Sequence, residues 1–180
     1  FGVVVGARRI SIASGDGGFL ESRDDGKTWE VISRTPEGIV LIIPQKQDIA
    51  RFWGLGNRGT LYSTDSAGRL WREKPPIRIS ERSVGTVHTL VWHAARASLL
   101  AGTDYGLIES YDGGETWRLI QLPIPPDTIP LIALAAHPHS AEIFWVAAGN
   151  TVYRTRDGGI TWSRHALSTE RSIALLAVDP

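Results

Sequence analysis

Aspartate is the residue type with the clearest chemical potential in this sequence, because it returns at a regular interval. The interval is roughly 45 residues, and each copy precedes a glycine and then a tryptophan. Repeated carboxylates suggest calcium ligands or paired catalytic acids. The alternative is that each carboxylate accepts backbone hydrogen bonds and closes a turn, a common role of Asp before Gly, and we prefer it. These residues are Asp24, Asp65, Asp112 and Asp157.

The aspartates belong to a motif of the form Ser/Thr-x-Asp-x-Gly-x-Thr-Trp. The best copy is 110–117, and the others are 22–29, 63–71 and 155–162. The second copy is aligned with one extra residue before its glycine and with Leu70 in place of Thr, so we expect its turn to differ. Gly supplies the positive φ of the turn. Trp begins the next strand, and its ring covers the turn. The turn residues are Asp24, Gly26, Trp29, Asp65, Gly68, Trp71, Asp112, Gly114, Trp117, Asp157, Gly159 and Trp162.

The motif resembles the Asp-box, or bacterial neuraminidase repeat. It is similar to the boxes of sialidases, sortilin-type receptors, xyloglucan-cleaving glycosidases and, closest in style, photosystem II assembly factors. The resemblance implies an all-β fold, a β-propeller of four-stranded antiparallel blades. It also places each box on the turn between the third and fourth strands, away from the ligand face. A repeat of this length supports the same architecture.

Apolar runs separated by Gly and Pro predict four strands within each repeat and almost no helix. We expect blades at about 1–34, 35–80, 81–126 and 127–170, within a single partial propeller. The segment 171–180 resembles 130–138 and is expected to be the first strand of a fifth blade. Four blades and one further strand indicate part of a larger ring.

Composition excludes several classes of function. Nineteen basic and nineteen acidic residues cancel, so no overall field attracts nucleic acid. The absence of cysteine removes disulfides and thiolate metal sites. No apolar run approaches the roughly 20 residues of a transmembrane helix. The sequence has no methionine and begins at Phe1, which suggests a removed leader or a partial polypeptide.

Strand direction predicts which residues share the end of the blades opposite the boxes. That end receives the turns between second and third strands and the links between blades. Its densest positive stretch lies at 69–82, and we expect Arg58, Arg72, Arg78, Arg82 and Tyr105 to bind a partner. A solvated loop with local ion pairs remains the alternative. The full set expected at this end is Asp16, Arg34, Arg58, Arg72, Lys74, Arg78, Arg82, Asp104, Tyr105, Asp127 and Asn150.

No catalytic residue and no metal ligand is assigned. Sialidases hold a substrate carboxylate with three arginines, the first in Arg-Ile-Pro, and Arg78-Ile79-Ser80 lacks that proline. Asp16 and Asp104 lie at equivalent turns of different blades, which makes them unsuitable as a catalytic pair. His137 and His139 suggest a metal, but His137 aligns with His93 at a strand end, where a turn-capping role suffices.

Two classes of function follow. The first is a non-catalytic scaffold that binds a protein partner without a cofactor, and the resemblance implies assembly or capping of a membrane-associated, photosynthetic-type complex. An extracytoplasmic location, in a periplasm, a lumen or outside the cell, is implied by the same resemblance. The second is a carbohydrate-binding or sialidase-like, glycoside-hydrolysing propeller, which would favour long loops with exposed aromatic residues. We expect the first class.

Overall fold

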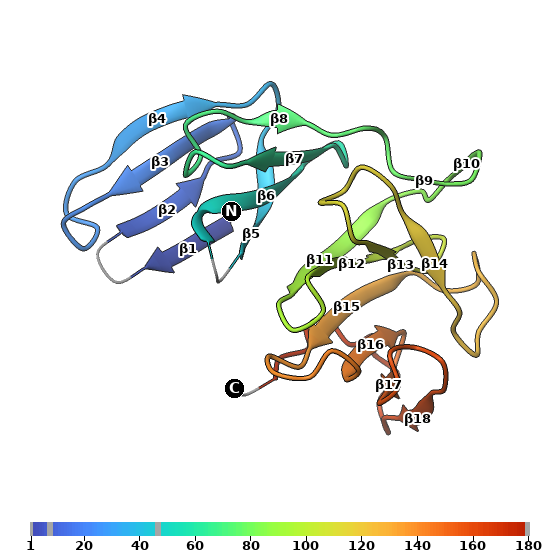
Figure 1. The fold of residues 1–180 in the computed structure, drawn as a ribbon. Coiled ribbons are helices and arrows are strands. Elements are labelled where there is room, and N and C mark those ends of the chain that lie inside the picture. The colour runs from blue at the N-terminus through green and yellow to red at the C-terminus, as the bar shows by residue number, and fades with distance from the viewer. Residues whose placement is uncertain (1, 7–8, 46–47, 179–180) are drawn as a thin grey trace. The chain divides into compact units, whose positions relative to one another are not determined.

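All regular structure in the computed structural model is β-sheet, and the part of the chain it describes, residues 2–6, 9–45 and 48–178, contains no helix. Consequently no helix there could cross a membrane. Four-stranded antiparallel sheets dominate (Figure 1), so the predicted all-β propeller class is confirmed. The chain forms two compact units, Phe1–Pro76 and Ile77–Pro180.

The first sheet of the first unit is a meander in which each strand pairs with the next. Its second and third strands are joined by a turn at 14–17, where Asp16 Oδ1 accepts a hydrogen bond from the Gly18 N–H at 3.2 Å. Short strands and polar turn residues explain this order, because each hairpin closes locally. The strands are β1 (Gly2–Gly6), β2 (Arg9–Ala13), β3 (Gly18–Ser22) and β4 (Glu30–Arg34).

The second sheet of this unit has the same order and packs through its first strand against β1 and β2. The buried core between the sheets centres on Phe19, whose ring lies 6.3 Å from that of Phe52 and 5.2 Å from that of Trp71. Aromatic burial of this kind is a large source of stability in a small unit. The strands are β5 (Ile39–Gln45), β6 (Asp48–Gly56), β7 (Leu61–Thr64) and β8 (Arg72–Glu73).

The second unit begins with a two-stranded hairpin, which lies in the stretch expected to link two blades. Its strands are β9 (Arg78–Ile79) and β10 (Arg82–Ser83), and Ser80 takes a positive φ of 54° in the turn. Such a short hairpin is not stable by itself, so it depends on contacts with the rest of the unit.

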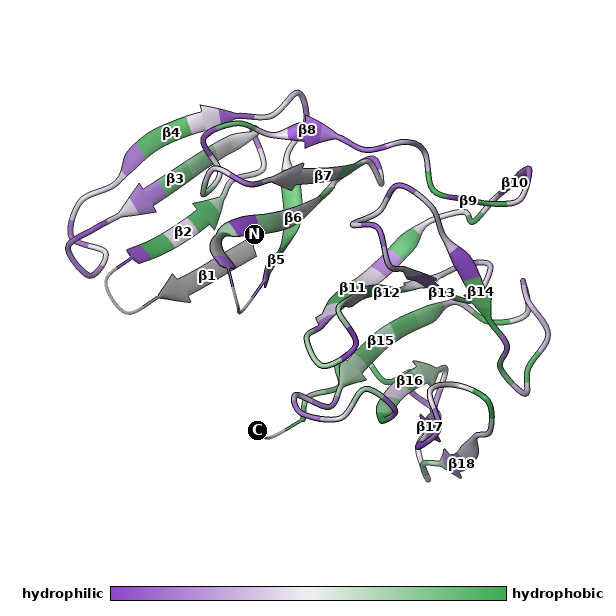
Figure 2. Cartoon of the chain, viewed as in Figure 1, coloured by the Kyte–Doolittle hydropathy of each residue, from purple (hydrophilic) through white to green (hydrophobic). Residues whose placement is uncertain are grey.

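Two four-stranded sheets follow, and β15 packs against β11 and β12. Every residue of β12 is buried, which fits a strand covered on both faces. The core includes Leu100, Leu131, Phe144, Val146 and Tyr153. Figure 2 shows the apolar character of β15 and the hydrophilic character of β8. The strands are β11 (Val87–His93), β12 (Ser98–Thr103), β13 (Leu107–Ser110), β14 (Arg118–Ile120), β15 (Leu131–Ala136), β16 (Phe144–Ala148), β17 (Thr151–Thr155) and β18 (Ser163–Ala166).

The segment expected to open a fifth blade forms no strand over the described residues 171–178. Its backbone is held instead by the Ile173 N–H, which donates to the Gly149 carbonyl at 2.8 Å. A strand requires a hydrogen-bonded neighbour, and the described residues supply no further strand for this segment to pair with. That this segment opens a fifth blade therefore stays a prediction.

Candidate functional site

Three of the four boxes share one set of hydrogen bonds around the aspartate. In the third box, Asp112 Oδ1 accepts from the Ser110 hydroxyl at 2.8 Å and from the Thr116 N–H at 2.9 Å, while its Oδ2 accepts from the Thr116 hydroxyl. The first and fourth boxes repeat these contacts around Asp24 and Asp157. The carboxylate therefore ties both ends of the turn together.

The same contacts keep these carboxylates ionised. Thr161, through its hydroxyl first and then its N–H, lowers the pKa of Asp157 to about 2. Burial alone would raise the pKa of Asp112, but the hydrogen bonds from Thr116 and Ser110 outweigh it and lower that pKa to about 2. A general acid requires a raised pKa, so these aspartates suit turn closure better than proton donation.

The second box corrects the sequence alignment, because it contains no extra residue. Thr64, one residue later than expected, accepts the Gly68 N–H at 3.1 Å, as Ser22 accepts the Gly26 N–H at 2.8 Å in the first box. Ser66 occupies the aspartate position, and its hydroxyl accepts the Leu70 N–H at 3.0 Å. Asp65 lies at the variable position before it and pairs with Arg72 at 3.5 Å.

The tryptophans of the boxes differ in how far they are buried and in the carbonyl to which the indole N–H donates. The indole N–H of Trp29 donates to the Gly26 carbonyl at 3.0 Å within its own turn, and 38% of that residue is exposed. The indole N–H of Trp162 instead donates to the Gln121 carbonyl at 2.8 Å, which links the last sheet of the second unit to the one before it. Trp71 and Trp117 are half-buried. The shared motif therefore does not give every tryptophan the same contacts.

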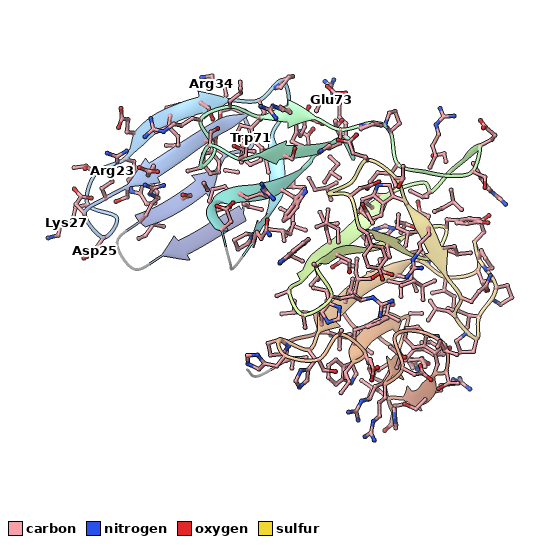
Figure 3. All side chains as sticks on the ribbon, in the orientation of Figure 1. Arg23, Asp25, Lys27, Arg34, Trp71 and Glu73 are labelled. Carbon is pink, nitrogen blue, oxygen red and sulfur yellow. The ribbon has the colours of Figure 1, made fainter. Side chains whose placement is uncertain are left out.

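Two of the five residues expected to bind a partner lie in the first unit. The side chain of Arg72 is exposed beside the second box, where it pairs with Asp65, and this is not the opposite end of the strands, where sequence reasoning expected it. Arg58 lies in the β6–β7 turn, and its backbone N–H donates to the buried carboxylate of Glu37 at 2.8 Å. Figure 3 illustrates the two ends of the first sheet, with Lys27 at the box hairpin and Arg34 at the far end of β4.

The other three lie in the second unit, where Arg82 and Tyr105 form a cluster with Asp127. The guanidinium of Arg82 lies 4.9 Å from the centre of the Tyr105 ring and 2.5 Å from Asp127 Oδ2. The Asp127 N–H donates to the Tyr105 carbonyl at 3.1 Å, so the Pro-rich link is fixed to the same turn. Arg78 lies opposite Ser83 in the strand pairing of the hairpin. Its side chain is exposed and contacts no charged or hydrogen-bonding group among the described residues. The hairpin is therefore fixed through one arginine and presents the other.

A second pair fixes the base of the hairpin. Asp104 Oδ1 lies 2.7 Å from His88 Nε2, and its Oδ2 accepts the Thr86 N–H at 2.7 Å. The hydrogen bond from His88, followed by that from Thr86, lowers the pKa of Asp104. Sequence reasoning missed the role of His88, and its position two residues after Thr86 at the start of β11 was the available signal. We refer to Arg78, Arg82, Tyr105 and Asp127, with His88 and Asp104 beneath them, as the hairpin surface.

An apolar hollow adjoins the hairpin surface. It is lined by Tyr105 and by residues of the Pro-rich link, among them Leu122, Ile124 and Pro126. It has room for about one water molecule. The hollow is too small for a sugar or a cofactor, so binding at this place would occur over the surface.

The histidines considered as metal ligands serve the turns. His137 Nδ1 accepts the His139 N–H at 3.2 Å, and the two rings lie 6.4 Å apart. The buried His93 places Nε2 at 2.9 Å from the Ser140 carbonyl, and burial lowers its pKa. No group of three or more metal-ligating side chains occurs among the residues that the structure describes.

Comparison with known proteins identifies one of the repeats. The BNR/Asp-box repeat family matches residues 153–164, which contain the fourth box. The photosystem II assembly lipoprotein Ycf48 of Picosynechococcus sp. PCC 7002 is 28% identical over 159 residues, which are 86% of this chain and 45% of that protein. The chain thus spans about half the length of the curated relative it matches.

Solved structures show the same architecture. Ycf48 from Cyanidioschyzon merolae superposes with a TM-score of 0.67 at 18% identity, over 97% of this chain and 58% of that one. Ycf48 bound to D1 peptide gives 0.65 at 16% identity, over 99% and 57%. An ancestral GH74 enzyme gives 0.69 at 17% identity, over 91% and 25%. At these identities the superpositions show the fold alone, that of Asp-box β-propeller blades.

Proposed function

Because the chain consists of Asp-box propeller blades, we propose that it acts as a non-catalytic scaffold that binds a polypeptide during assembly of a membrane-associated complex. The hairpin surface is the proposed binding site. Its exposed Arg78 carries the proposal, since it stands on a hairpin whose other arginine is already held by Asp127 and Tyr105. A guanidinium on a fixed support loses little freedom on binding a carboxylate, which favours affinity.

Similarity to an assembly factor supports this choice over other propeller functions. The curated relative is described as a photosystem II assembly lipoprotein, and one solved relative is described as bound to a D1 peptide. The same similarity supports an extracytoplasmic location beside a membrane. Arg58 and Arg72, in the first unit, stay predicted partner contacts.

Recovery of partners from membranes of the source organism tests the proposal. The bait is the full chain, and the variants are Arg78→Glu and Arg82→Glu. We expect both to lose most of the captured protein, because Arg78→Glu reverses the charge at the proposed contact and Arg82→Glu breaks the ion pair with Asp127 that fixes the hairpin. Arg171→Glu, an exposed arginine outside the hairpin surface, is the control and should capture as the wild type does. Equal capture by all variants would refute the proposed site.

The alternative is a carbohydrate-active propeller, which the superposition on GH74 enzymes supports at the level of fold. The two acids considered for catalysis are engaged in their own turns. The Ser14 hydroxyl, then the Gly18 N–H and Arg34, lower the pKa of Asp16 to about 2, and His88 lowers that of Asp104. Neither suits the raised pKa of a catalytic acid. One solved neighbour is a xyloglucanase, so release of reducing sugar from xyloglucan by the chain would favour this alternative.

A further inference from the structure

Three of the described sheets carry the same irregularity in their first strand. One residue of that strand is left without a partner between two paired neighbours: Val40 in β5, His88 in β11 and Ile132 in β15. A bulge of this kind re-aims the extra side chain. Two of the sheets place an aliphatic residue there, whereas the sheet of β11 places a histidine, and that residue is exposed. The bulge in β11 therefore presents a titratable group to solvent.

The residue directly after the second strand differs between the same three sheets. It is Asn57 after β6, Asp104 after β12 and Gly149 after β16. Two of these turns share a backbone bond, since the Asn57 N–H donates to the Gly38 carbonyl at 2.8 Å and the Asp104 N–H to the Thr86 carbonyl at 3.1 Å. The sheet of β11 thus adds a carboxylate to a turn whose backbone is already closed.

The Asp104 carboxylate connects the bulge to the segment 84–86, which runs from the hairpin into β11 (Figure 1). Its Oδ1 lies 2.7 Å from His88 Nε2, and its Oδ2 accepts the Thr86 N–H at 2.7 Å. The carboxylate lies close to Gly85, where an added Cβ would be 2.7 Å from Oδ2. The two oxygens of one side chain therefore join the histidine to the base of the hairpin.

Tyr105 carries the same restraint to the arginine that fixes the hairpin. Its N–H donates to the carbonyl of the buried Val84 at 3.1 Å, and its carbonyl accepts the Asp127 N–H at 3.1 Å. Its ring lies 4.9 Å from the Arg82 guanidinium. A change at Asp104 therefore reaches the hairpin surface through the next residue of the chain.

Few other charges face His88. Its own strand and the two strands packed against it, β12 and β15, contain no Asp, Glu, Lys or Arg, and His93 lies buried at the far end of β11. His88 first, and then the Thr86 N–H, lowers the pKa of Asp104, so this carboxylate stays ionised near the ordinary histidine pKa of about 6.5. The charge of the pair therefore changes at the histidine. The charged side chains of the hairpin and the Pro-rich link are Arg78, Glu81, Arg82 and Asp127.

We propose that protonation of His88 controls how firmly the hairpin surface is held and how tightly it binds. The imidazolium forms an ion pair with Asp104 and fixes the segment 84–86. The neutral imidazole keeps a hydrogen bond but leaves the Asp104 charge uncompensated, which loosens the support of Arg78 and repels a carboxylate of the partner. The inference rests on the function proposed above for this surface, and it names the regulation of that site.

NMR of the full chain tests the switch without a partner. The His88 ring and the backbone amides of 78–86 are followed from about pH 5.5 to about pH 8.5. We expect these amides to shift with the midpoint of the ring, and the exchange protection of the Thr86 and Tyr105 amides to fall about two- to fivefold as the pH rises, as for an exposed ion pair. His88→Gln should show neither response. His165→Gln, at an exposed histidine of β18, is the matched control and should respond as the wild type does.

Peptide titration tests the consequence for binding. The probe contains four consecutive glutamates, which stay ionised over this range because their ordinary pKa is about 4.3, and the control peptide contains glutamines. Calorimetry on the wild type should show about two- to fivefold tighter binding of the glutamate peptide at the lower pH. His88→Gln should bind it equally at both values.

Several outcomes would overturn the inference. One is a His88 ring that titrates while the hairpin amides stay unchanged, and another is a His88→Gln chain that keeps the wild-type response. Equal binding of the glutamate peptide by the wild type at both pH values would also overturn it, and would leave the proposed binding site intact. Binding of neither peptide, with amides that still respond, would count instead against the function proposed for the surface.

A second variant decides the matter if His88→Gln is unfolded by circular dichroism. Asp104→Asn keeps an acceptor for the Thr86 N–H but loses the charge that the imidazolium pairs with. It should therefore abolish the response of the hairpin amides while the His88 ring still titrates. A response of wild-type size in Asp104→Asn would show that the ion pair does not control the hairpin.

Discussion

In the first box a carboxylate holds the turn, and in the second box of the same unit a hydroxyl does. Asp24 accepts the Thr28 N–H at 2.9 Å, and Ser66 accepts the Leu70 N–H at 3.0 Å. The backbone is the same in both, with φ of 58° and 83° at Asp25 and Gly26 and of 54° and 82° at Ala67 and Gly68. The path of the turn therefore does not depend on the aspartate.

The two boxes differ in what surrounds the glycine. A Cβ added at Gly26 would meet nothing closer than 3.8 Å, whereas one at Gly68 would lie 2.1 Å from the Phe19 ring. Ala67 and Trp71 pack against the same aromatic core. The second box thus compensates for its missing carboxylate with burial, and the first relies on hydrogen bonds near solvent.

The largest expected effect comes from placing alanine at the two glycines. Gly26→Ala should cost about 1–2 kcal/mol of unfolding free energy, the cost of a left-handed conformation for a residue with a Cβ. Gly68→Ala carries that cost and an overpacking penalty of about 1–3 kcal/mol against Phe19. Urea denaturation followed by Trp fluorescence measures both. Equal losses would contradict the inferred burial of the second box.

Stability measured over a range of pH distinguishes turns closed by a carboxylate from turns closed by a hydroxyl. The pKa of Asp112 is about 2 in the folded chain, below its ordinary value, so its stabilisation is complete above about pH 4 and is lost as the pH falls through about 2. Asp112→Asn should cost about 1 kcal/mol at pH 7, because charge-assisted hydrogen bonds become neutral ones. That cost should vanish as the pH falls below about 2.

Ser66→Ala provides the control for this series. It removes a turn hydrogen bond without removing a charge, so its penalty should stay constant from pH 7 to pH 2. Denaturation midpoints of the wild type and both variants, measured at each pH, decide the matter. A parallel shift of both variants would show that the carboxylate contributes no pH dependence.

The fold was largely predictable because its signals are local. Each box lies within eight residues of sequence, and its Gly-x-x-Trp spacing shows where a third strand ends and a fourth begins. The second box was misaligned because Ser63 and Thr64 are adjacent hydroxyl residues and Asp65 was the only nearby acid. The conformation of Gly68 decides the alignment, and residue types alone do not reveal it.

The candidate surfaces were less predictable because their contacts are distant in sequence. Arg82 and Asp127 are held together through Tyr105 and the Pro-rich link, and no short motif encodes that pairing. Arg72 was assigned to the wrong end because it was grouped with the link residues of the positive stretch 69–82, whereas it is the first residue of β8 and lies beside the box.

Restoring the missing Asp and Thr of the second box should raise the stability of the chain modestly. Ser66→Asp with Leu70→Thr would restore the carboxylate and its threonine partner, and we expect about 0.5–1 kcal/mol of added stability at pH 7. Leu70 is 59% exposed, so its replacement removes little burial. The gain should disappear in acid, as for the other boxes. Ser66→Asn with Leu70→Thr, which lacks the charge, should show no such pH dependence.

The smallest effect tests the residues before the two glycines. Asp25 and Ala67 hold left-handed conformations that glycine adopts freely. Asp25 is exposed, so Asp25→Gly should gain about 0.5 kcal/mol after the greater unfolded-state entropy of glycine is subtracted. Ala67 packs against the aromatic core, and loss of its methyl, worth about 0.8 kcal/mol, should cancel the same relief. Thermal midpoints should therefore rise for Asp25→Gly and stay level for Ala67→Gly, whereas equal shifts would place both turns in the same environment.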